Sequence, residues 1–399
     1  MLYPLKFKPY LKFYPYGGRR FVEVFEMESV PRDADVAEAW EISDHGEEQS
    51  TVVNGPLAER TLRQLMQEYQ AQLVGEEVYA TYGDYFPLLL KFLDCDKRLP
   101  AHMHPNDHHA RRLGLKDTGK TEAWYIVRAD PGANAYCGSL PDLTPDKFRA
   151  AIERGDGYDG VMKKTPTTTG ETYFVPPGRL HGLDADNLAF EIQQNSDAGF
   201  GWDWAGFVEA GVIPAEDARQ HPELAIECAY YEDGVQEQTN YVTIDEDGVE
   251  RTFCAACQYF VLERWRATKT FTFHDAAPRF NTLTVISGAA TFSGNGESVV
   301  ARHGESLLIP AGVDVEIGPE QVSGEVEMLR CYVPNLERDV VEPLRQRGIT
   351  PHDIAWLGSY GQGNDLFSLL GMPQDAFNVT PEQRRAAIEH GKSSRDETS

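Results

Sequence analysis

The sequence has no apolar run long enough to cross a bilayer. Its longest apolar stretches, residues 86–90 and 306–310, are far shorter than the roughly 20 residues that a membrane helix needs. The first residues also lack the apolar core of a secretory signal. We therefore expect a cytoplasmic protein that has no membrane as its partner.

Cysteine is also scarce, with six residues in a chain of 399. These cysteines follow no regular spacing, so they predict no disulfide framework, and we expect reduced thiols. Only Cys254 and Cys257 form a Cys-x-x-Cys pair, and no second pair lies nearby to complete a tetrahedral zinc site. We interpret these two residues as strand thiols without a redox or metal role.

Basic residues are too few to balance the acidic ones, and the formal net charge is −26. The mean field of such a protein repels phosphates at long range. This argues against nucleic acids and anionic membranes as partners. An anionic substrate would therefore need a local cationic pocket.

The sequence does contain many short β-like runs, such as "EAWYIVRA", "TLTVISGAATF" and "ESLLIPAG", separated by glycine and proline turns. Two helices stand out among them. The first covers residues 61–73, where an apolar stripe follows a capping box formed by Thr61 and Gln64. The second begins after Thr144 and ends at Gly155. The pattern predicts a mainly β protein with a few helices.

An internal repeat is the most informative feature of the organisation. "GETYFVPPGRLHGL" from Gly170 is echoed by "GESLLIPAGVDVEI" from Gly304. Each copy reads as a glycine turn, an apolar strand and a Pro-x-Gly turn into the next strand, which is typical of a cupin barrel. Aligning the two turns sets His181 opposite Val315, which cannot bind a metal. We therefore expect two cupin (jelly-roll) barrels, with chemistry in the first.

The strongest chemical signal is the segment "LPAHMHPND". His102 and His104 are two residues apart, so both side chains project from one face of a β-strand. Glu122 in "GKTEAWYIV" and His181 in "PPGRLHGL" follow later in the same barrel. Three imidazoles and one carboxylate suit Zn²⁺, and also Mn²⁺, Fe²⁺ or Co²⁺, and leave positions open for substrate oxygens.

With these residues in place, the chain resembles the type I mannose-6-phosphate isomerases, which are zinc-dependent cupins. The resemblance extends to about residue 335. It is carried by six motifs in order: "EAWEIS", "NGPL", "PLLLKFLD", "GKTEAWYI", "YFVPPGRLHGL" and "LAFEIQQNSD". In this comparison His104, Glu122 and His181 match the family's metal ligands directly, whereas His102 stands in the place of its usual glutamine.

Two further departures concern the substrate. Pro100 stands where the family has a serine, and Gly201 stands where it has an arginine. Neither side chain can bind a phosphate or stabilise an enediolate. These two departures leave the identity of the sugar open.

The resemblance also implies roles for four residues of the pocket. Glu191, on the strand after the last ligand turn, is the candidate proton shuttle. Lys120, beside Glu122, is expected to orient the sugar or to assist ring opening. Lys91 matches another basic position of the family's pocket, and the nearby Arg179 is expected to replace part of the missing cation, so both are candidate substrate contacts.

On this basis we divide the chain into three parts. Residues 1–205 form an N-terminal catalytic cupin domain that binds the metal, and residues 206–335 form a second cupin domain without metal ligands. Residues 336–399 form a helical extension that ends in the polar run "GKSSRDETS", which we expect to be disordered.

The expected function is that of a metal-dependent isomerase that interconverts mannose 6-phosphate and fructose 6-phosphate through a cis-enediol. Three alternatives stay open. One is an isomerase of another sugar, including an unphosphorylated one, and the second is a non-catalytic sugar-binding cupin. The third is a metal-dependent oxygenase, because many iron cupins use three histidines and one glutamate. The sequence does not indicate the oligomeric state.

Overall fold

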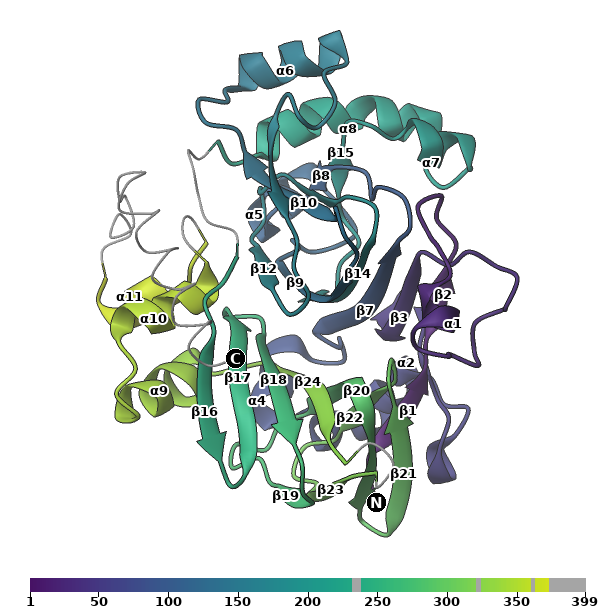
Figure 1. Cartoon of the computed structure of the whole chain (residues 1–399), viewed down its shortest axis with the longest axis vertical. Coiled ribbons are helices and arrows are strands. Elements are labelled where there is room, and N and C mark those ends of the chain that lie inside the picture. The colour runs from purple at the N-terminus through teal and green to yellow at the C-terminus, as the bar shows by residue number, and fades with distance from the viewer. Residues whose placement is uncertain (232–237, 321–323, 360–362, 373–399) are drawn as a thin grey trace.

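The computed structural model describes residues 1–231, 238–320, 324–359 and 363–372. As expected, the protein is mainly β, with a cupin fold and helices at its periphery (Figure 1). One half of the molecule holds two antiparallel sheets that lie over each other, and the other half is built on a single large sheet.

A six-stranded sheet and a five-stranded sheet form the first half. Strands in the six-stranded sheet run in the order β12 (Thr172–Val175), β9 (Glu122–Ala129), β14 (Asn187–Gln194), β7 (Leu88–Cys95), β3 (Glu38–Ile42) and β2 (Tyr10–Lys12). Those in the five-stranded sheet run in the order β11 (Met162–Pro166), β10 (Asn134–Ser139), β13 (His181–Leu183), β8 (His102–Met103) and β15 (Phe200–Gly201). A small hairpin, β4 (Asp44–His45) and β5 (Glu48–Gln49), lies beside them.

An eleven-stranded sheet forms the second half. Its main path is β16 (Val242–Glu246), β17 (Val249–Ala256), β18 (Val261–Ala267), β24 (Val326–Tyr332), β20 (Asn281–Gly294), β22 (Ser306–Ile309), β1 (Leu5–Lys8) and β6 (Thr51–Val52). Three more strands pair off this path: β19 (Phe271–Phe273), β21 (Glu297–Arg302) and β23 (Val315–Pro319).

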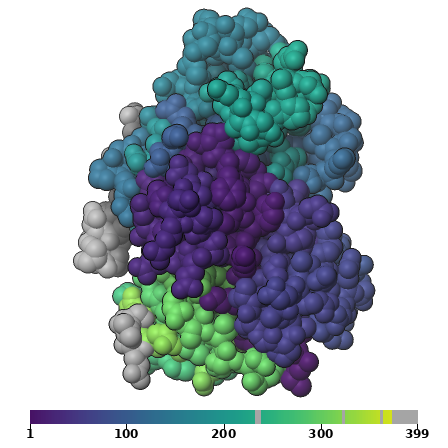
Figure 2. Space-filling model, turned by 90° about the vertical axis from the view of Figure 1, so that its right-hand side faces the viewer, coloured from purple at the N-terminus to yellow at the C-terminus, as the bar shows by residue number. Residues whose placement is uncertain are grey.

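The first strand of the chain belongs to the second half. Leu5 of β1 pairs with Leu308 of β22, so the N-terminal segment crosses from one half to the other. Figure 2 shows this segment, in purple, on the face between the teal upper part and the green lower part. β1 and β6 therefore extend the sheet of the second half, and the division of the chain near residues 205 and 335 stays a prediction.

The repeat seen in the sequence marks equivalent positions of the two halves. Gly170 and Gly304 have φ of +89° and +83°, a conformation that favours glycine, and they precede β12 and β22. His181 begins β13, and Val315 begins β23. The predicted correspondence between these two positions is therefore confirmed.

The helices cover the outside of the sheets. They are α1 (Arg20–Glu23), α2 (Leu62–Tyr69), α3 (Ala71–Val74), α4 (Glu76–Tyr82), α5 (Asp107–Leu113), α6 (Pro145–Arg154), α7 (Ala205–Glu209), α8 (Ala215–Cys228), α9 (Glu342–Gln346), α10 (Pro351–Ala355) and α11 (Leu366–Leu370), with short turns η1 (Gly55–Leu57), η2 (Glu337–Val341) and η3 (Trp356–Gly358). The capping box of Thr61 and Gln64 opens α2 as predicted, and Thr144 caps α6. The helix predicted over 61–73 is broken at Gln70, whose φ is +48°.

The described part of the C-terminal extension is helical, as expected, and packs on the second half. Leu344, Ile354 and Phe367 share a buried cluster with Phe253 and Tyr332. The predicted disordered tail lies outside the described residues.

All six cysteines lie in the described part of the chain, where they are buried and form no disulfide. Burial raises the pKa of Cys254 to about 12, which fits an unreactive structural thiol. No helix within the described ranges is long and apolar enough to cross a membrane.

Candidate metal centre and active site

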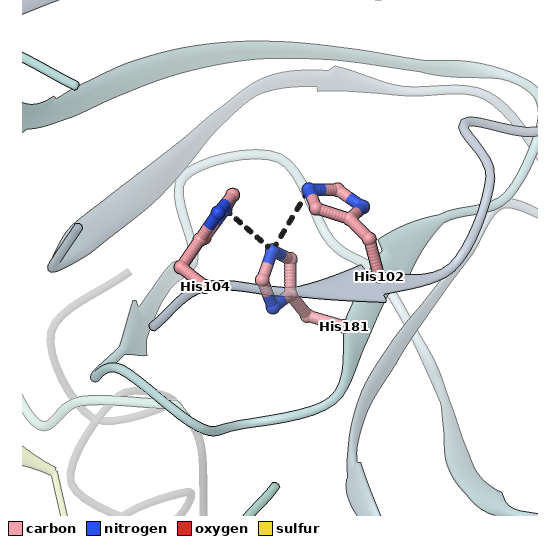
Figure 3. Close-up of side chains that lie close together, drawn as sticks. All are labelled: His102, His104 and His181. Atoms are coloured by element: carbon pink, nitrogen blue, oxygen red, sulfur yellow. Dashed lines mark hydrogen bonds between the residues drawn. The ribbon is translucent and has the colours of Figure 1, made fainter. Parts of the chain in front are cut away.

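The candidate site lies between the two sheets of the first half. His102 on β8 and His181 on β13 are direct cross-strand partners in the five-stranded sheet. Glu122, the first residue of β9, comes from the six-stranded sheet opposite. His104 follows β8 closely, which brings the predicted His-x-His pair into the same space (Figure 3).

The four predicted ligands converge. The Nε2 atom of His181 lies 3.1 Å from the Nε2 atoms of both His102 and His104, the approaches dashed in Figure 3. The carboxylate of Glu122 lies 3.2 Å from His104 Nε2 and 3.3 Å from His181 Nε2. His181 and Glu122 are at most 1% exposed, and His104 is 3% exposed.

Each histidine is oriented through its other ring nitrogen. A backbone carbonyl can only accept a hydrogen bond, so each Nδ1 carries the proton and each Nε2 presents a lone pair. The carbonyls are those of Pro100 to His102 (2.8 Å), Ala198 to His104 (2.7 Å) and Arg179 to His181 (2.7 Å). Burial lowers the pKa of His102 to about 3 and holds the pKa values of His104 and His181 well below the usual range, so all three rings are neutral.

This arrangement fits a metal ion. Three neutral imidazole lone pairs that face one another, with a buried carboxylate beside them, repel unless a cation lies between them. Ligand atoms bound to one divalent ion at about 2.1 Å lie about 3.0 to 3.4 Å apart, and the four separations given above fall in this range.

A buried chain of charges continues from Glu122 along the six-stranded sheet. Lys120 Nζ lies 2.8 Å from Glu122 Oε2 and 3.1 Å from Glu191 Oε1. Lys91 Nζ lies 3.5 Å from Glu191 Oε1 and 3.2 Å from Glu38 Oε2. Lys91 on β7 and Glu191 on β14 are direct cross-strand partners, which fixes their side chains on one face.

These contacts shift the pKa values of the groups. Burial alone would lower the pKa of Lys120, but Glu122 and Glu191 outweigh it and raise the value. Burial and the neighbouring charge of Glu122 raise the pKa of Glu191, whereas Lys120 lowers that of Glu122 despite its burial. Two adjacent carboxyl groups with pKa values pushed apart are typical of sites that transfer protons.

The site opens into a cavity of about 600 Å³, a size typical of small-molecule sites. Lys91, Lys120 and Glu191 line this cavity together with His102, His104 and Glu122. The sequence analysis missed the wall contributed by Tyr10, Lys12, Tyr14, Trp124, Trp204 and His221. Alternation along a strand could have indicated part of it, because Trp124 is two residues after Glu122 and shares its face.

Arg179 is not among the residues that line the cavity. Its Nη1 donates to the carbonyl of Phe174 (2.9 Å) and to Ser359 Oγ (3.2 Å), and the side chain is 4% exposed. Its backbone carbonyl accepts the Nδ1 proton of His181 and so orients this ring. The structure therefore does not support the predicted substrate contact, because packing directs the guanidinium elsewhere.

Pro100 and Gly201, which stand in place of the family's serine and arginine, both contact His102 through the backbone. The carbonyl of Pro100 accepts the Nδ1 proton of His102, so this position still orients a ligand. Gly201 pairs with His102 across β15 and β8. A Cβ atom at position 201 would lie 2.5 Å from the indole of Trp204, so a larger side chain has no room there.

Comparison with known proteins gives two family matches. Residues 5–123 match the model for the catalytic domain of type I phosphomannose isomerase, and residues 249–333 match the model for the cupin domain of mannose-6-phosphate isomerase. The first match contains three of the four candidate ligands.

Individual proteins agree with these matches. The chain is 29% identical over 316 residues to GmuF of Bacillus subtilis, a probable mannose-6-phosphate isomerase, and the aligned region covers 78% of this chain and 94% of that one. The crystal structure of the mannose 6-phosphate isomerase from Bacillus subtilis shares the fold, with a TM-score of 0.71 and 24% identity. The matched region covers 83% of this chain and 100% of that one. Another solved mannose 6-phosphate isomerase, bound with zinc and yttrium, matches with a TM-score of 0.62 and 14% identity. This match covers 83% of this chain and 100% of that one.

Proposed function

Because this chain belongs to the type I phosphomannose isomerase family of enzymes, we propose that it is a metal-dependent isomerase that interconverts mannose 6-phosphate and fructose 6-phosphate. The observation that carries the proposal is the cluster of three imidazole nitrogens, with Glu122 against it. Glu191 lies next to this cluster, between Lys91 and Lys120. The similarity to GmuF, a probable mannose-6-phosphate isomerase, supports the choice of substrate.

We assign the metal to His102, His104, Glu122 and His181. This donor set favours Zn²⁺, and it also accommodates Mn²⁺, Fe²⁺ or Co²⁺. The bound ion would polarise the carbonyl and hydroxyl oxygens of the sugar and stabilise negative charge on them. Zinc is the metal we propose, in line with the zinc-bound structure of a protein with this fold.

The proton moves between C2 and C1 of the sugar through a cis-enediol. We assign Glu191 as the group that removes the proton from one carbon and returns it to the other. Its carboxylate is 3% exposed and lines the cavity, and its Oε1 atom is approached by the ammonium groups of both lysines. The lysines on either side hold it in place.

Lys120 lies between the metal ligand and the proton acceptor. From this position its ammonium can donate to a substrate oxygen and assist ring opening. Lys91 holds Glu191 from the other side and is the second candidate sugar contact. Both lysines are at most 4% exposed, so water competes little for their protons.

The direct test is to measure bound metal and turnover of mannose 6-phosphate in the wild type, in His181→Ala and in His108→Ala. We expect about one ion per chain in the wild type and loss of both metal and turnover in His181→Ala. His108 is exposed and outside the cavity, so His108→Ala controls for the loss of an imidazole. Turnover that survives in His181→Ala would contradict the proposal.

A further inference from the structure

The cavity contains cations, but all of them are already paired. Among the described residues that line it, the positive side chains are lysines, arginine is absent, and the hydroxyl groups are those of Tyr10, Tyr14 and Tyr16. Lys91 and Lys120 each contact two carboxylates. Lys12 forms an ion pair with Glu48 and lies 4.5 Å from the centre of the Trp40 ring. A phosphate would have to displace a carboxylate to gain a lysine.

Carboxylates also outnumber lysines in this cavity. Besides the candidate ligand Glu122, its described lining includes Glu38, Glu191 and Asp197. The net charge of the whole chain, −26, adds to the repulsion of a dianion that approaches the site. A recognised phosphate is usually met by arginine, by hydroxyl groups or by the N-terminus of a helix.

Aromatic rings line the route from the opening to the histidines. Tyr14 stacks near Phe207 with ring centres 5.4 Å apart, and Phe207 lies 5.2 Å from Trp204. Trp204 in turn lies 6.1 Å from the ring of His102. The indole of Trp204 also occupies the space beside Gly201, which excludes a longer side chain there.

The outer end of this wall is exposed and apolar. Phe13 is 57% exposed, Tyr10 is 38% exposed and Val212 is 36% exposed, and all three line the cavity. Solvent-exposed rings at the opening of a polar site are suited to the apolar C–H faces of a sugar.

Two indole N–H groups supply polar contacts of the kind that hydroxyl groups need. The Nε1 atoms of Trp124 and Trp204 are buried and have no hydrogen-bond partner among the described residues, and both side chains line the cavity. Trp124 is the cross-strand neighbour of Glu191, so it lies beside the proposed proton acceptor. A buried donor without a partner costs free energy that a sugar hydroxyl would recover.

From these observations we infer that the enzyme isomerises the uncharged aldose, D-mannose, at least as efficiently as its 6-phosphate. The aromatic wall receives the end of the sugar that carries C6, and the phosphate is tolerated without being recognised. This inference rests on the proposed isomerase function and concerns the substrate class of the same site. The reaction needs no co-reactant, because the proton taken from C2 returns to C1.

The test compares kcat/KM for D-mannose and mannose 6-phosphate in the metal-loaded enzyme. We expect the value for mannose to equal or exceed that for the phosphate. Raising the salt concentration from about 10 to about 150 mM should increase kcat/KM for the phosphate, because salt screens the repulsion, and leave that for mannose unchanged. A higher kcat/KM for the phosphate than for mannose, or a kcat/KM for the phosphate that falls with salt, would overturn the inference.

A matched pair of variants tests the wall itself. Val212→Arg adds a guanidinium at the opening, and Val53→Arg makes the same change at an exposed valine outside the cavity lining. We expect Val212→Arg to raise the ratio of phosphate to mannose kcat/KM by about tenfold or more, and Val53→Arg to leave it unchanged. Equal ratios in both variants would count against the inference.

The same measurements separate the inference from the function on which it rests. Turnover of mannose 6-phosphate without turnover of mannose would refute the inference and leave the proposed function intact. If neither sugar is turned over by the metal-loaded enzyme, both fail.

Discussion

Replacing Glu191 by glutamine should abolish most of the turnover while leaving the metal in place. The amide keeps nearly the volume of the carboxylate but cannot accept a proton from carbon. Loss of a general base typically lowers the rate by about 10² to 10⁴, which corresponds to about 3 to 5 kcal/mol of barrier. Glu191 is not among the proposed ligands, so metal content should stay near that of the wild type.

The effect on stability should be smaller than the effect on rate. Glu191 Oε1 lies 3.1 Å from Lys120 Nζ and 3.5 Å from Lys91 Nζ, so the substitution removes a charge from two buried ion pairs. Each lysine keeps a second carboxylate, Glu122 at 2.8 Å or Glu38 at 3.2 Å. The cost should therefore stay below the roughly 3 to 5 kcal/mol of leaving a buried charge unpaired.

The matched control is Glu263→Gln in the second half of the molecule. Glu263 is fully buried and contacts Arg251 (3.0 Å) and Arg330 (3.3 Å), so it is also a paired internal carboxylate. This control should lower the melting temperature and keep kcat near the wild-type value. Steady-state kinetics, deuterium exchange at C2 and metal analysis on both variants provide the readout. A Glu191→Gln enzyme with more than about a third of wild-type kcat would refute the assignment, since base loss costs about 10² or more.

Three further predictions concern Lys120, the buried Glu263 and the bound metal. Lys120→Met should lower kcat by about 10² or more without a matching loss of metal, because Lys120 is not a ligand; an equal loss of metal, measured by elemental analysis, would contradict this. Burial alone would raise the pKa of Glu263, but Arg251 and Arg330 lower it from 4.5 to about 2. Its contribution to the free energy of unfolding, about 3 kcal/mol, is therefore complete above pH 4.5 and is lost as the pH falls toward 2. The free energies of unfolding of wild type and Glu263→Gln, measured in urea, should converge in acid, and a difference that stays constant with pH would refute this prediction. A chelator should lower both turnover and the melting temperature, and added Zn²⁺ should restore both; a melting curve that does not change would count against a bound ion.

Local patterns in the sequence predicted the part of the site that local geometry determines. His102 and His104 lie two residues apart, which is enough to place both on one face of a strand. The repeated glycine and Pro-x-Gly turns allowed His181 to be aligned with Val315, and Gly170 and Gly304 do adopt positive φ at equivalent positions. Periodicity and turn chemistry act over a few residues, so they can be read from a single sequence.

Features that depend on tertiary packing could not be predicted in this way. Lys91 contacts Glu38 because β7 pairs with β3, and strand pairing is not encoded in either strand alone. The aromatic wall near Tyr14 comes from the N-terminal segment, far from the ligands in the sequence. Arg179 follows a Pro-Gly turn next to a ligand strand, but the direction of its side chain is set by contacts with Phe174 and Ser359.

The most direct test of the metal site is an anomalous-scattering map of crystals of the purified protein, recorded at the absorption edge of the bound metal. One peak should lie between the two sheets of the first half, about 2.0 to 2.3 Å from the Nε2 atoms of His102, His104 and His181 and from an oxygen of Glu122. A peak bound by other residues, or histidine rings turned away from one another in the crystal, would contradict the account.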